Sequence, residues 1–378
     1  MDNLSELRVL IDQVDIDIHQ LLNKRAALAN QVAQIKIADA KKKGDSDIIY
    51  YRPEREAAVL HAVKQRNTGP LSDNESARLF REIMSACLAL EEPLTIAYLG
   101  PAGTFTQAAA YKHFGHSVNT SAFSTINQVF KEVETKNCQY GVVPIENSTE
   151  GVISHTLDLF ISSSLKIVGE VTLRIHHNLM SKTTDLSSIK TVYSHQQSLA
   201  QCRSWLDENF PNVDRVPVKS NAEAARLAQL DDSCAAIAGD IAAGLYELAI
   251  HYSQIEDNPD NTTRFLILGH QEVDITRIDG VDGLAEKIPL KKLNKTSLLM
   301  SSENKPGALF SLLQPISDNQ ISMTNIESRP SQCGLWEYVF FIDIEGHYKE
   351  PHIQAAISEI EKKATMVKVL GSYPQAVI

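Results

Sequence analysis

The chain has 378 residues, enough for two or three domains, and its 43% hydrophobic and 22% charged residues are an ordinary balance for globular proteins. Its formal net charge of −11 argues against binding to nucleic acids or to anionic membranes. The acidic start is not that of a signal peptide, and no apolar run approaches the roughly 20 residues of a membrane span. Five scattered cysteines without a CxxC pair argue against disulfides and a zinc site. We therefore expect a cytoplasmic protein without a metal or organic cofactor.

Residues 1–92 carry only helical patterning, and one position breaks the pattern of the first helix. Its apolar seam repeats at alternating spacings of three and four, through Leu4, Leu7, Ile11, Val14, Ile18, Leu21, Leu28, Val32 and Ile35. Position 25 belongs to this seam and holds Arg25, and a guanidinium on a buried stripe is costly unless an anion pairs with it. No acid stands one turn away, so the partner must come from another helix or from a ligand.

Arg8 and Lys36 flank the same face of this helix. Arg8 lies 17 residues before Arg25, roughly 25 Å at the 1.5 Å rise of a helix, whereas Arg25 and Lys36 are only about 16 Å apart. If all three bind one ligand, Arg8 must come from a second copy of the chain. The spacing therefore predicts an intertwined helical dimer with shared sites.

Two further helices are predicted before residue 92. Asn3 with Glu6 is a candidate cap for the first helix, and residues 41–44 and the next few residues are expected to form a loop. Pro53 is expected to open the second helix, and Ser72 or Asp73 the third. The third helix carries a second charge on its apolar stripe, Glu91. The candidate anion site therefore comprises Arg8, Arg25, Lys36, Arg55, Glu56 and Glu91; the alternatives are solvated surface charges or an internal Arg25–Glu91 ion pair.

Residues 94–270 alternate between buried strands and helices, which is typical of an α/β domain. Several strands end in polar turns, where open α/β sheets bind ligands. These turns are Gly100–Phe105, Pro144–Ser148, Ser194–Gln196 and Asn261–Phe265. Each turn is equally compatible with ordinary turn chemistry, and Ser194 is expected to cap a helix rather than to act as a nucleophile, because no GxSxG motif surrounds it.

Residues 271–295 are polar and charged and read as a linker. Residues 296–373 follow the order strand, helix, strand, strand, helix, strand, which is ferredoxin-like. Two segments there, Lys305–Leu309 and Glu327–Pro330, could bind a small molecule or could simply be turns.

Taken in chain order, these motifs resemble the bifunctional P-proteins, the chorismate mutase–prephenate dehydratases, over nearly the whole chain. The resemblance implies an all-helical mutase of intertwined dimers at residues 1–92. It implies a two-lobed, periplasmic-binding-protein-like α/β dehydratase at residues 94–270, and an α+β ferredoxin-like ACT domain at residues 296–373. Chorismate would be rearranged to prephenate, prephenate decarboxylated and dehydrated to phenylpyruvate, and L-phenylalanine would inhibit by feedback.

For the mutase, the resemblance assigns Arg8 of the partner chain, Arg25 and Arg55 to the carboxylates and ether region of chorismate. Lys36 would donate to the ether oxygen and Glu56 would bind the ring hydroxyl. The full set is Arg8, Arg25, Lys36, Arg52, Arg55, Glu56, Cys87 and Glu91. Arg52 stands where some members carry aspartate, and Glu91 where some carry glutamine. An ionised Glu91 would repel the developing oxyanion, so we expect mutase activity to fall as the pH rises and Glu91 ionises.

For the dehydratase, the resemblance makes Thr263 essential, with a hydrogen bond to the ring hydroxyl that leaves. Threonine is too weak an acid to protonate that hydroxyl unaided, so a relay through Glu146, His195 or water is expected, and Arg264 is a candidate carboxylate anchor. The full set is Thr104, Glu146, Asn147, Ser148, Ser194, His195, Gln196, Thr263 and Arg264. The phenylalanine site, at a subunit interface, would comprise Asn304, Gly307, Ala308, Leu309, Glu327, Ser328 and Arg329.

Two other hypotheses stay open from the sequence. One is a dehydratase whose N-terminal helices only dimerise, and the other is a non-catalytic amino-acid sensor. In each case the expected partners are small molecules and further copies of the chain, as a homodimer or a higher oligomer, and neither nucleic acid nor membrane.

Overall fold

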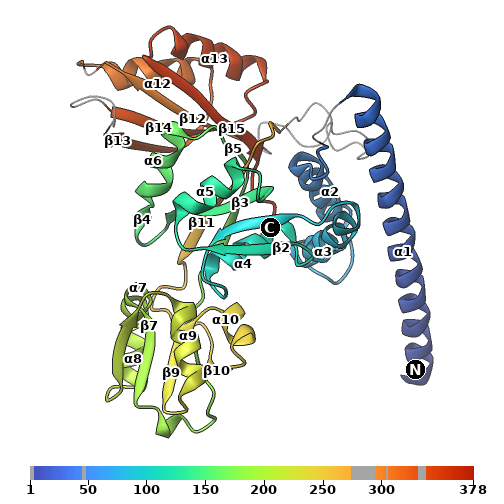
Figure 1. Cartoon of the computed structure of the whole chain (residues 1–378), viewed down its shortest axis with the longest axis vertical. Helices are drawn as coiled ribbons and strands as arrows, with labels where there is room; N and C mark the ends of the chain where they lie inside the picture. The colour runs from blue at the N-terminus through green and yellow to red at the C-terminus, as the bar shows by residue number, and fades with distance from the viewer. Residues whose placement is uncertain (1–3, 45–47, 274–293, 304, 331–337) are drawn as a thin grey trace.

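The computed structural model of the chain describes residues 4–44, 48–273, 294–303, 305–330 and 338–378. Three helices come first, two sheets flanked by helices follow, and a third sheet ends the chain (Figure 1). Most of the predicted linker, together with Asn3 and Asn304, lies outside the described residues. Within them, no helix is both long and apolar enough to cross a membrane.

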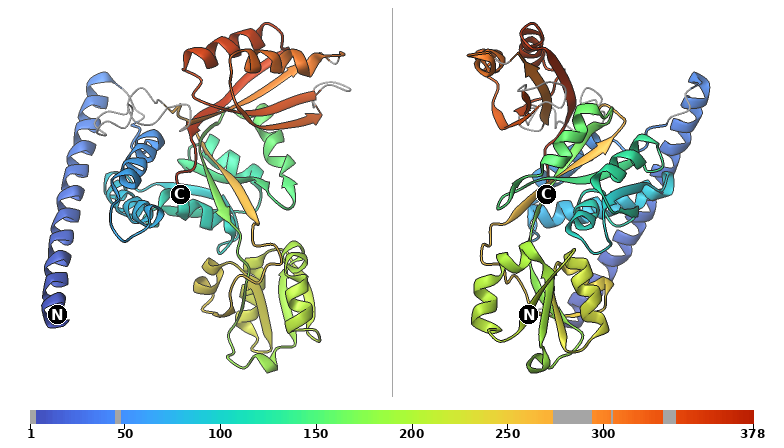
Figure 2. Two further views of the ribbon diagram at one scale, coloured as in Figure 1. Left: turned by 180° about the vertical axis from the view of Figure 1, so that it is seen from behind. Right: turned by 60° about the vertical axis from the view of Figure 1, so that its left-hand side comes forward.

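Helix α1 (Leu4–Lys43) stands apart from the body of the molecule over most of its length (Figures 1 and 2). The prediction of a loop beginning at residue 41 is wrong, because the helix continues to Lys43 and ends before Gly44. Alanine and lysine, which fill its last turns, are good helix formers, and glycine is the usual residue after a helix end. The predicted apolar seam is exposed in the single chain, at Leu4, Leu7, Ile11, Val14, Ile18, Leu21, Leu28, Val32 and Ile35.

Helices α2 (Pro53–Arg66) and α3 (Asp73–Glu91) pack against each other beside the C-terminal part of α1. Pro53 occupies the first turn of α2, as predicted. Ser72 caps α3 by accepting a hydrogen bond from the Glu75 amide. Tyr51, just before α2, is buried between Phe114 and Tyr140 at ring-centroid distances of 5.3 Å each and so fixes the helices to the next domain.

The first lobe of the α/β domain is a six-stranded sheet of order β2-β1-β3-β11-β5, with β4 paired to β3. Strands β1, β2 and β3 are parallel, and β11 runs antiparallel to both β3 and β5. The elements are β1 Thr95–Leu99, α4 Phe105–Phe114, β2 Asn119–Phe123, α5 Ile126–Glu134, β3 Tyr140–Asn147, β4 Gly151–Val152, α6 Ser154–Ser162, β5 Lys166–Arg174 and β11 Thr262–Gly269.

The second lobe is a five-stranded sheet of order β10-β6-β9-β7-β8. The chain enters it between β5 and β6 and leaves it between β10 and β11, so two segments join the lobes. The elements are β6 Asn178–Ser181, η1 Leu186–Ser188, β7 Thr191–His195, α7 Gln196–Gln201, α8 Arg203–Asn209, β8 Asp214–Val218, α9 Asn221–Leu230, β9 Cys234–Ala238, α10 Asp240–Leu245 and β10 Ala249–Tyr252.

The third sheet has the order β13-β14-β12-β15 and is antiparallel, with α12 and α13 on one face. The predicted ferredoxin-like order is confirmed by its elements, β12 Asn294–Ser302, α12 Ala308–Asp318, β13 Met323–Pro330, β14 Tyr338–Glu345, α13 Pro351–Glu361 and β15 Met366–Pro374. Strand β15 crosses β5 of the first lobe so closely that a Cβ on Gly371 would lie 2.1 Å from the Ile167 carbonyl oxygen. This contact therefore requires glycine.

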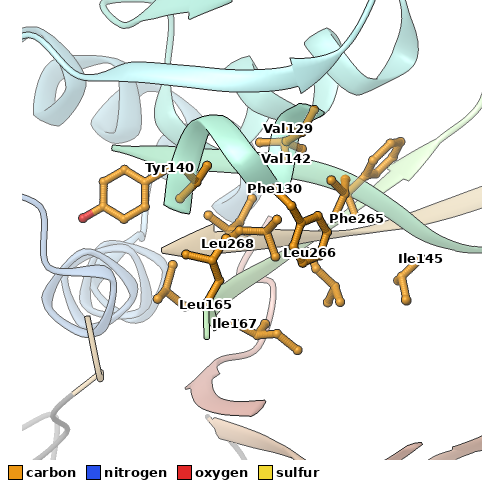
Figure 3. Close-up of a cluster of buried hydrophobic side chains, with 14 of the residues drawn as sticks. Val129, Phe130, Tyr140, Val142, Ile145, Leu165, Ile167, Phe265, Leu266 and Leu268 are labelled. Atoms are coloured by element: carbon orange, nitrogen blue, oxygen red, sulfur yellow. The ribbon is translucent and has the colours of Figure 1, made fainter. Parts of the chain in front are cut away.

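The largest core lies in the first lobe, where helix α5 packs on strands β1, β3 and β11 and contributes Val129 and Phe130 to the buried cluster (Figure 3). Phe130 from the helix and Leu266 from β11 point into one cluster with Ile167 of β5. Burying a side chain of this size contributes about 1.5–3 kcal/mol. The core thereby holds β3 and β11 in register and fixes the positions of the polar residues at their ends.

Candidate active sites

An open pocket of about 510 Å³ lies between α1, α2 and α3. Most of the residues predicted for the mutase line it, namely Arg25, Lys36, Arg52, Arg55, Glu56, Cys87 and Glu91. Apolar side chains such as Leu28, Val32 and Met84 complete its wall. Cations brought together from separate helices on an apolar wall suit a small, partly apolar dianion.

Arg8 is the one predicted mutase residue outside this pocket. It is exposed near the start of α1, and its distance of roughly 25 Å along the helix from Arg25 keeps it from the pocket of its own chain.

Glu91 is paired with Lys36 rather than with Arg25. The Lys36 Nζ lies 3.4 Å from Glu91 Oε2 and donates to the Tyr50 carbonyl oxygen at 3.2 Å. Arg25 is partly buried, and no ion pair or hydrogen bond joins it to any residue that the structure describes. The alternative of an internal Arg25–Glu91 ion pair is therefore wrong, and Arg25 is left to face the pocket.

The Glu56 carboxylate is held by a residue that the sequence analysis missed. Arg81 of α3 donates from Nε to Glu56 Oε1 at 3.1 Å and from a terminal nitrogen to the Lys112 carbonyl oxygen at 2.7 Å. Burial raises the pKa of Glu56, and Arg81 opposes this rise. The only signal in the sequence was that Arg81 lies one helical turn before Met84 of the apolar stripe. Arg52 is similarly paired, with Glu54 at 2.7 Å.

A second pocket, of about 380 Å³, lies in the cleft between the two lobes. Four of the residues predicted for the dehydratase line it: Thr104, Asn147, His195 and Thr263. Thr263 is 8% exposed and stands opposite Asn147 in the pairing of β11 with β3. Asn147 Nδ2 donates to Thr263 Oγ1 at 2.7 Å, so the threonine oxygen accepts and its own proton is free for another acceptor.

The prediction that Arg264 anchors a substrate carboxylate in this cleft is wrong. Neighbouring residues of a strand point to opposite faces, so Arg264 points away from the cleft and toward the third sheet. Its guanidinium lies 2.8 Å from Glu170 and 2.7 Å from Asp343, and donates to the Tyr373 hydroxyl at 3.1 Å. Burial opposes the charge, yet Tyr373, Asp343 and Glu170 together raise the pKa of Arg264. Arg264 therefore joins the dehydratase domain to the C-terminal domain.

Four more predicted dehydratase residues lie outside the cleft lining. Ser194 is fully buried and donates to the Ile237 carbonyl oxygen at 2.8 Å, and His195 rather than Ser194 caps α7. Gln196 is exposed on the first turn of that helix. Glu146 pairs in register with Arg264 and so shares its face of the sheet, away from Asn147. The Ser148 hydroxyl is hydrogen-bonded to the backbone of Thr262 at 2.9 Å.

The cleft also contains residues that the sequence analysis did not single out. His177, Gln197, Gln201 and Asn261 all line it. Asn261 belongs to the predicted turn before β11, whereas His177, between β5 and β6, and Gln201, at the end of α7, have no recognisable motif. His177 and Asn261 reach the cleft from the two segments that join the lobes, whereas Gln197 and Gln201 reach it from helix α7.

The predicted phenylalanine residues fall into two separate segments of the C-terminal domain. Gly307 precedes α12, and Glu327, Ser328 and Arg329 lie on β13, the edge strand of the sheet. No hydrogen bond or ion pair joins the two segments in the described part of the chain. Arg329 instead forms a two-pronged ion pair with Asp158 of α6, at 3.2 and 3.0 Å, and so contacts the dehydratase domain.

Three family models match the chain: chorismate mutase type II over residues 7–92, prephenate dehydratase over residues 96–273 and the ACT domain over residues 296–362. A bifunctional chorismate mutase/prephenate dehydratase of Pseudomonas aeruginosa is 51% identical over 378 residues, which cover 100% of this chain and 99% of that protein.

Among solved structures, prephenate dehydratase of Arthrobacter aurescens in complex with L-Phe is 30% identical at a TM-score of 0.65, covering 74% of this chain and 90% of that one. GqqA, described as a quorum-quenching acylase, is 26% identical at a TM-score of 0.66 and covers 75% of this chain and 98% of its own. The chain belongs to the family of bifunctional chorismate mutase/prephenate dehydratases, and it is an enzyme with both activities.

Proposed function

We propose that the helical pocket is the chorismate mutase site and that the cleft between the lobes is the prephenate dehydratase site. The observation that carries this proposal is the physical separation of two different sets of side chains. Cations from α1 and α2 surround the first pocket, whereas neutral amides, hydroxyls and imidazoles line most of the second.

In the mutase site, the reaction is an intramolecular rearrangement that needs no nucleophile and no proton transfer. The protein must hold the compact conformer of a dianion and stabilise the charge that grows on the ether oxygen. Arg25 and Arg55 would bind the carboxylates, and Lys36 would donate to the ether oxygen. Because Arg81 takes one side of the Glu56 carboxylate, its other oxygen is left to accept from the ring hydroxyl.

The mutase site would be completed by Arg8 of a second copy. The exposed apolar seam of α1 is too extensive for a helix that stays in water, since large exposed apolar patches mark association surfaces. Two copies that pack these seams together would bury them and bring each Arg8 toward the other chain's pocket. We propose a cytoplasmic homodimer on this basis, and the four described cysteines, which are free and buried, fit a reducing compartment.

In the dehydratase site, the ring hydroxyl must leave with a proton while the ring carboxylate leaves as CO₂. Thr263 is oriented to donate a hydrogen bond, because its oxygen accepts from Asn147. This donation would stabilise the leaving oxygen as the C–O bond lengthens. Of the relays considered for the proton, His195 lies at the cleft and Glu146 does not, which favours His195 or water.

The test follows chorismate, prephenate and phenylpyruvate separately. Thr263→Val keeps the shape of the side chain and removes its donor, and we expect it to abolish phenylpyruvate formation while chorismate is still converted to prephenate. Arg25→Ala should abolish the conversion of chorismate, while prephenate that is supplied directly should still be converted to phenylpyruvate. A non-catalytic sensor would convert neither substrate, and a dehydratase with inert helices would convert prephenate alone.

L-Phenylalanine is the proposed effector of the ACT domain. A ligand held between the Gly307–Leu309 turn of one subunit and β13 of another would order an interface whose residue Arg329 already contacts α6 of the dehydratase. Such a ligand can shift the cleft only if it binds the two cleft states differently. We expect Glu327→Ala to weaken inhibition by phenylalanine severalfold with little change in the uninhibited rate, and unchanged inhibition would contradict this assignment.

A further inference from the structure

The base of the dehydratase cleft holds two adjacent side chains that each keep one unsatisfied polar atom. Nδ1 of His177 and Nε2 of Gln201 are buried and have no hydrogen-bond partner within the described residues. Both residues line the cleft, and they contact each other, since His177 Nε2 lies 2.8 Å from Gln201 Oε1. Buried polar groups without a partner are rare in native proteins and require an explanation.

A continuous chain of hydrogen bonds connects this pair to Thr263, and the direction of every bond in it can be derived. The backbone amides of Thr149 and Glu150 donate to Asn147 Oδ1 at 3.0 and 3.1 Å. A backbone N–H can only donate, so this oxygen is the acceptor and Asn147 Nδ2 is the donor. That nitrogen donates to Thr263 Oγ1 at 2.7 Å and to Asn261 Oδ1 at 2.9 Å.

The same logic continues into the second lobe. Because Asn261 accepts with its oxygen, its Nδ2 donates to Gln201 Oε1, at 3.2 Å. Gln201 Oε1 is therefore an acceptor, and His177 must donate to it from a protonated Nε2. The neutral imidazole is then fixed as the Nε2–H tautomer. Two donors converge on Gln201 Oε1, so the amide of Gln201 cannot flip without breaking both bonds.

The surroundings of His177 keep it neutral and in place. It is 1% exposed, and burial lowers its pKa. The charged or titratable groups beside it are Glu256, which accepts from the His177 amide at 2.9 Å, and His176, which lies 2.7 Å from the same carboxylate. Phe105 of α4 packs edge-on against the imidazole at a centroid distance of 5.7 Å. His177 also lies in the first of the two segments that join the lobes.

We propose that His177 is a positioning residue of the dehydratase site. Its Nε2–H fixes the Gln201 amide so that the NH₂ group of Gln201 is presented to an oxygen of the anionic substrate. Asn261 donates to the same Gln201 oxygen and accepts from Asn147, which donates to Thr263, so the Gln201 amide and Thr263 belong to one hydrogen-bond chain. His177 thus acts through hydrogen-bond geometry and not by giving up its own proton. The inference rests on the proposed assignment of Thr263 to this site.

The test uses the full-length protein and two replacements that separate shape from hydrogen bonding. His177→Gln can place an amide N–H near the Nε2 position, whereas His177→Phe keeps a ring without a donor. We expect His177→Phe to lower the dehydratase kcat by about tenfold or more, the equivalent of one lost hydrogen bond in the transition state. The dehydratase kcat of His177→Gln should stay within about threefold of the parent value, and its pH profile should be unchanged.

A thermal unfolding profile like that of the parent reports that each variant is folded, and His251→Phe in the second lobe is the matched control. If His177→Phe does not fold, His177→Asn replaces it, because the shorter amide reaches the Nδ1 position and not the Nε2 position. Full dehydratase activity in His177→Phe or His177→Asn, which lack a donor at the Nε2 position, would overturn the proposal. The proposal would also be overturned if His177→Gln lowered the dehydratase kcat as much as His177→Phe and changed the pH profile. His177 would then transfer a proton itself. Full dehydratase activity in Thr263→Val would instead overturn the assignment of Thr263 on which the inference rests.

Discussion

The proposed sharing of each mutase site between two chains can be tested with a pair of variants that are inactive alone and active together. Arg8→Ala removes the contribution that each chain makes to its partner's site. Arg25→Ala removes the contribution that each chain makes to its own. The two arginines lie 17 positions apart on α1, roughly 25 Å of helix, so those of one chain cannot serve the same pocket.

Each homodimeric variant should lose most of its mutase activity. Arg25 is partly buried and has no competing ion pair in the described structure, so its contact with a carboxylate is a charge-assisted hydrogen bond worth about 1.5–3 kcal/mol. That range corresponds to a loss of roughly 10- to 150-fold in kcat/KM. A similar loss is expected for Arg8→Ala.

A hybrid dimer with one chain of each variant regains one intact site. One of its sites receives Arg25 and Arg8 from the two unchanged positions, and the other lacks both. The two variants are co-expressed with different affinity tags, the hybrid is purified through both tags, and chorismate consumption is measured. We expect about half of the parent rate per dimer, because one of two equivalent sites is complete.

The refuting results are equally definite. A hybrid as inactive as either parent variant would show that Arg8 and Arg25 do not meet across the interface. Full activity in the Arg8→Ala homodimer would show that the exposed first turns of α1 take no part in the site. Dehydratase activity, measured with prephenate, should be unchanged in all three proteins and serves as the folding control.

Two further predictions concern single side chains. Glu91 contacts Lys36 in the mutase pocket, and an ionised carboxylate there would repel a developing oxyanion to which an amide could donate. Glu91→Gln should therefore keep or raise mutase kcat/KM, and a loss of about tenfold or more would disprove the donor role. Burial holds the pKa of His113 well below its usual value, so the unfolded chain takes up the proton first and stability is lost as the pH falls below about 6.5. The free energy of unfolding is measured in urea at pH 7 and at pH 5. It should fall less from pH 7 to pH 5 in His113→Gln than in the parent, and an equal fall would show that His113 is not the source of this pH dependence.

The mutase pocket was largely predictable because a helix places residues by a simple period. Arg25 and Lys36 share one face of α1, and Glu91 lies on the apolar stripe of α3, so the sequence already placed them against other helices. What the pattern could not give was the pairing between helices. Glu91 meets Lys36 and Glu56 meets Arg81 because of how the three helices cross, which no periodicity records.

The dehydratase cleft was predicted less completely because strands alternate their faces. Asn147 and Thr263 were both predicted to belong to the dehydratase site, and they lie opposite each other in the pairing of β3 with β11. Arg264, although adjacent to Thr263, points to the other face and joins Glu170 and Asp343. His177 and Gln201 carry no motif at all. His177 reaches the site from a segment that joins the lobes, and Gln201 reaches it from the end of α7.

The sequence by itself determined the order and type of the elements, the unusual arginine in the first seam and the strand-end turns, because these depend on local periodicity and turn chemistry. Only the tertiary structure decided which face of β11 borders the cleft, which cation holds which carboxylate and how four amide and imidazole side chains align with Thr263. Those choices depend on contacts between segments more than 20 residues apart, whose geometry is set by packing and not by the residues next to them in the chain.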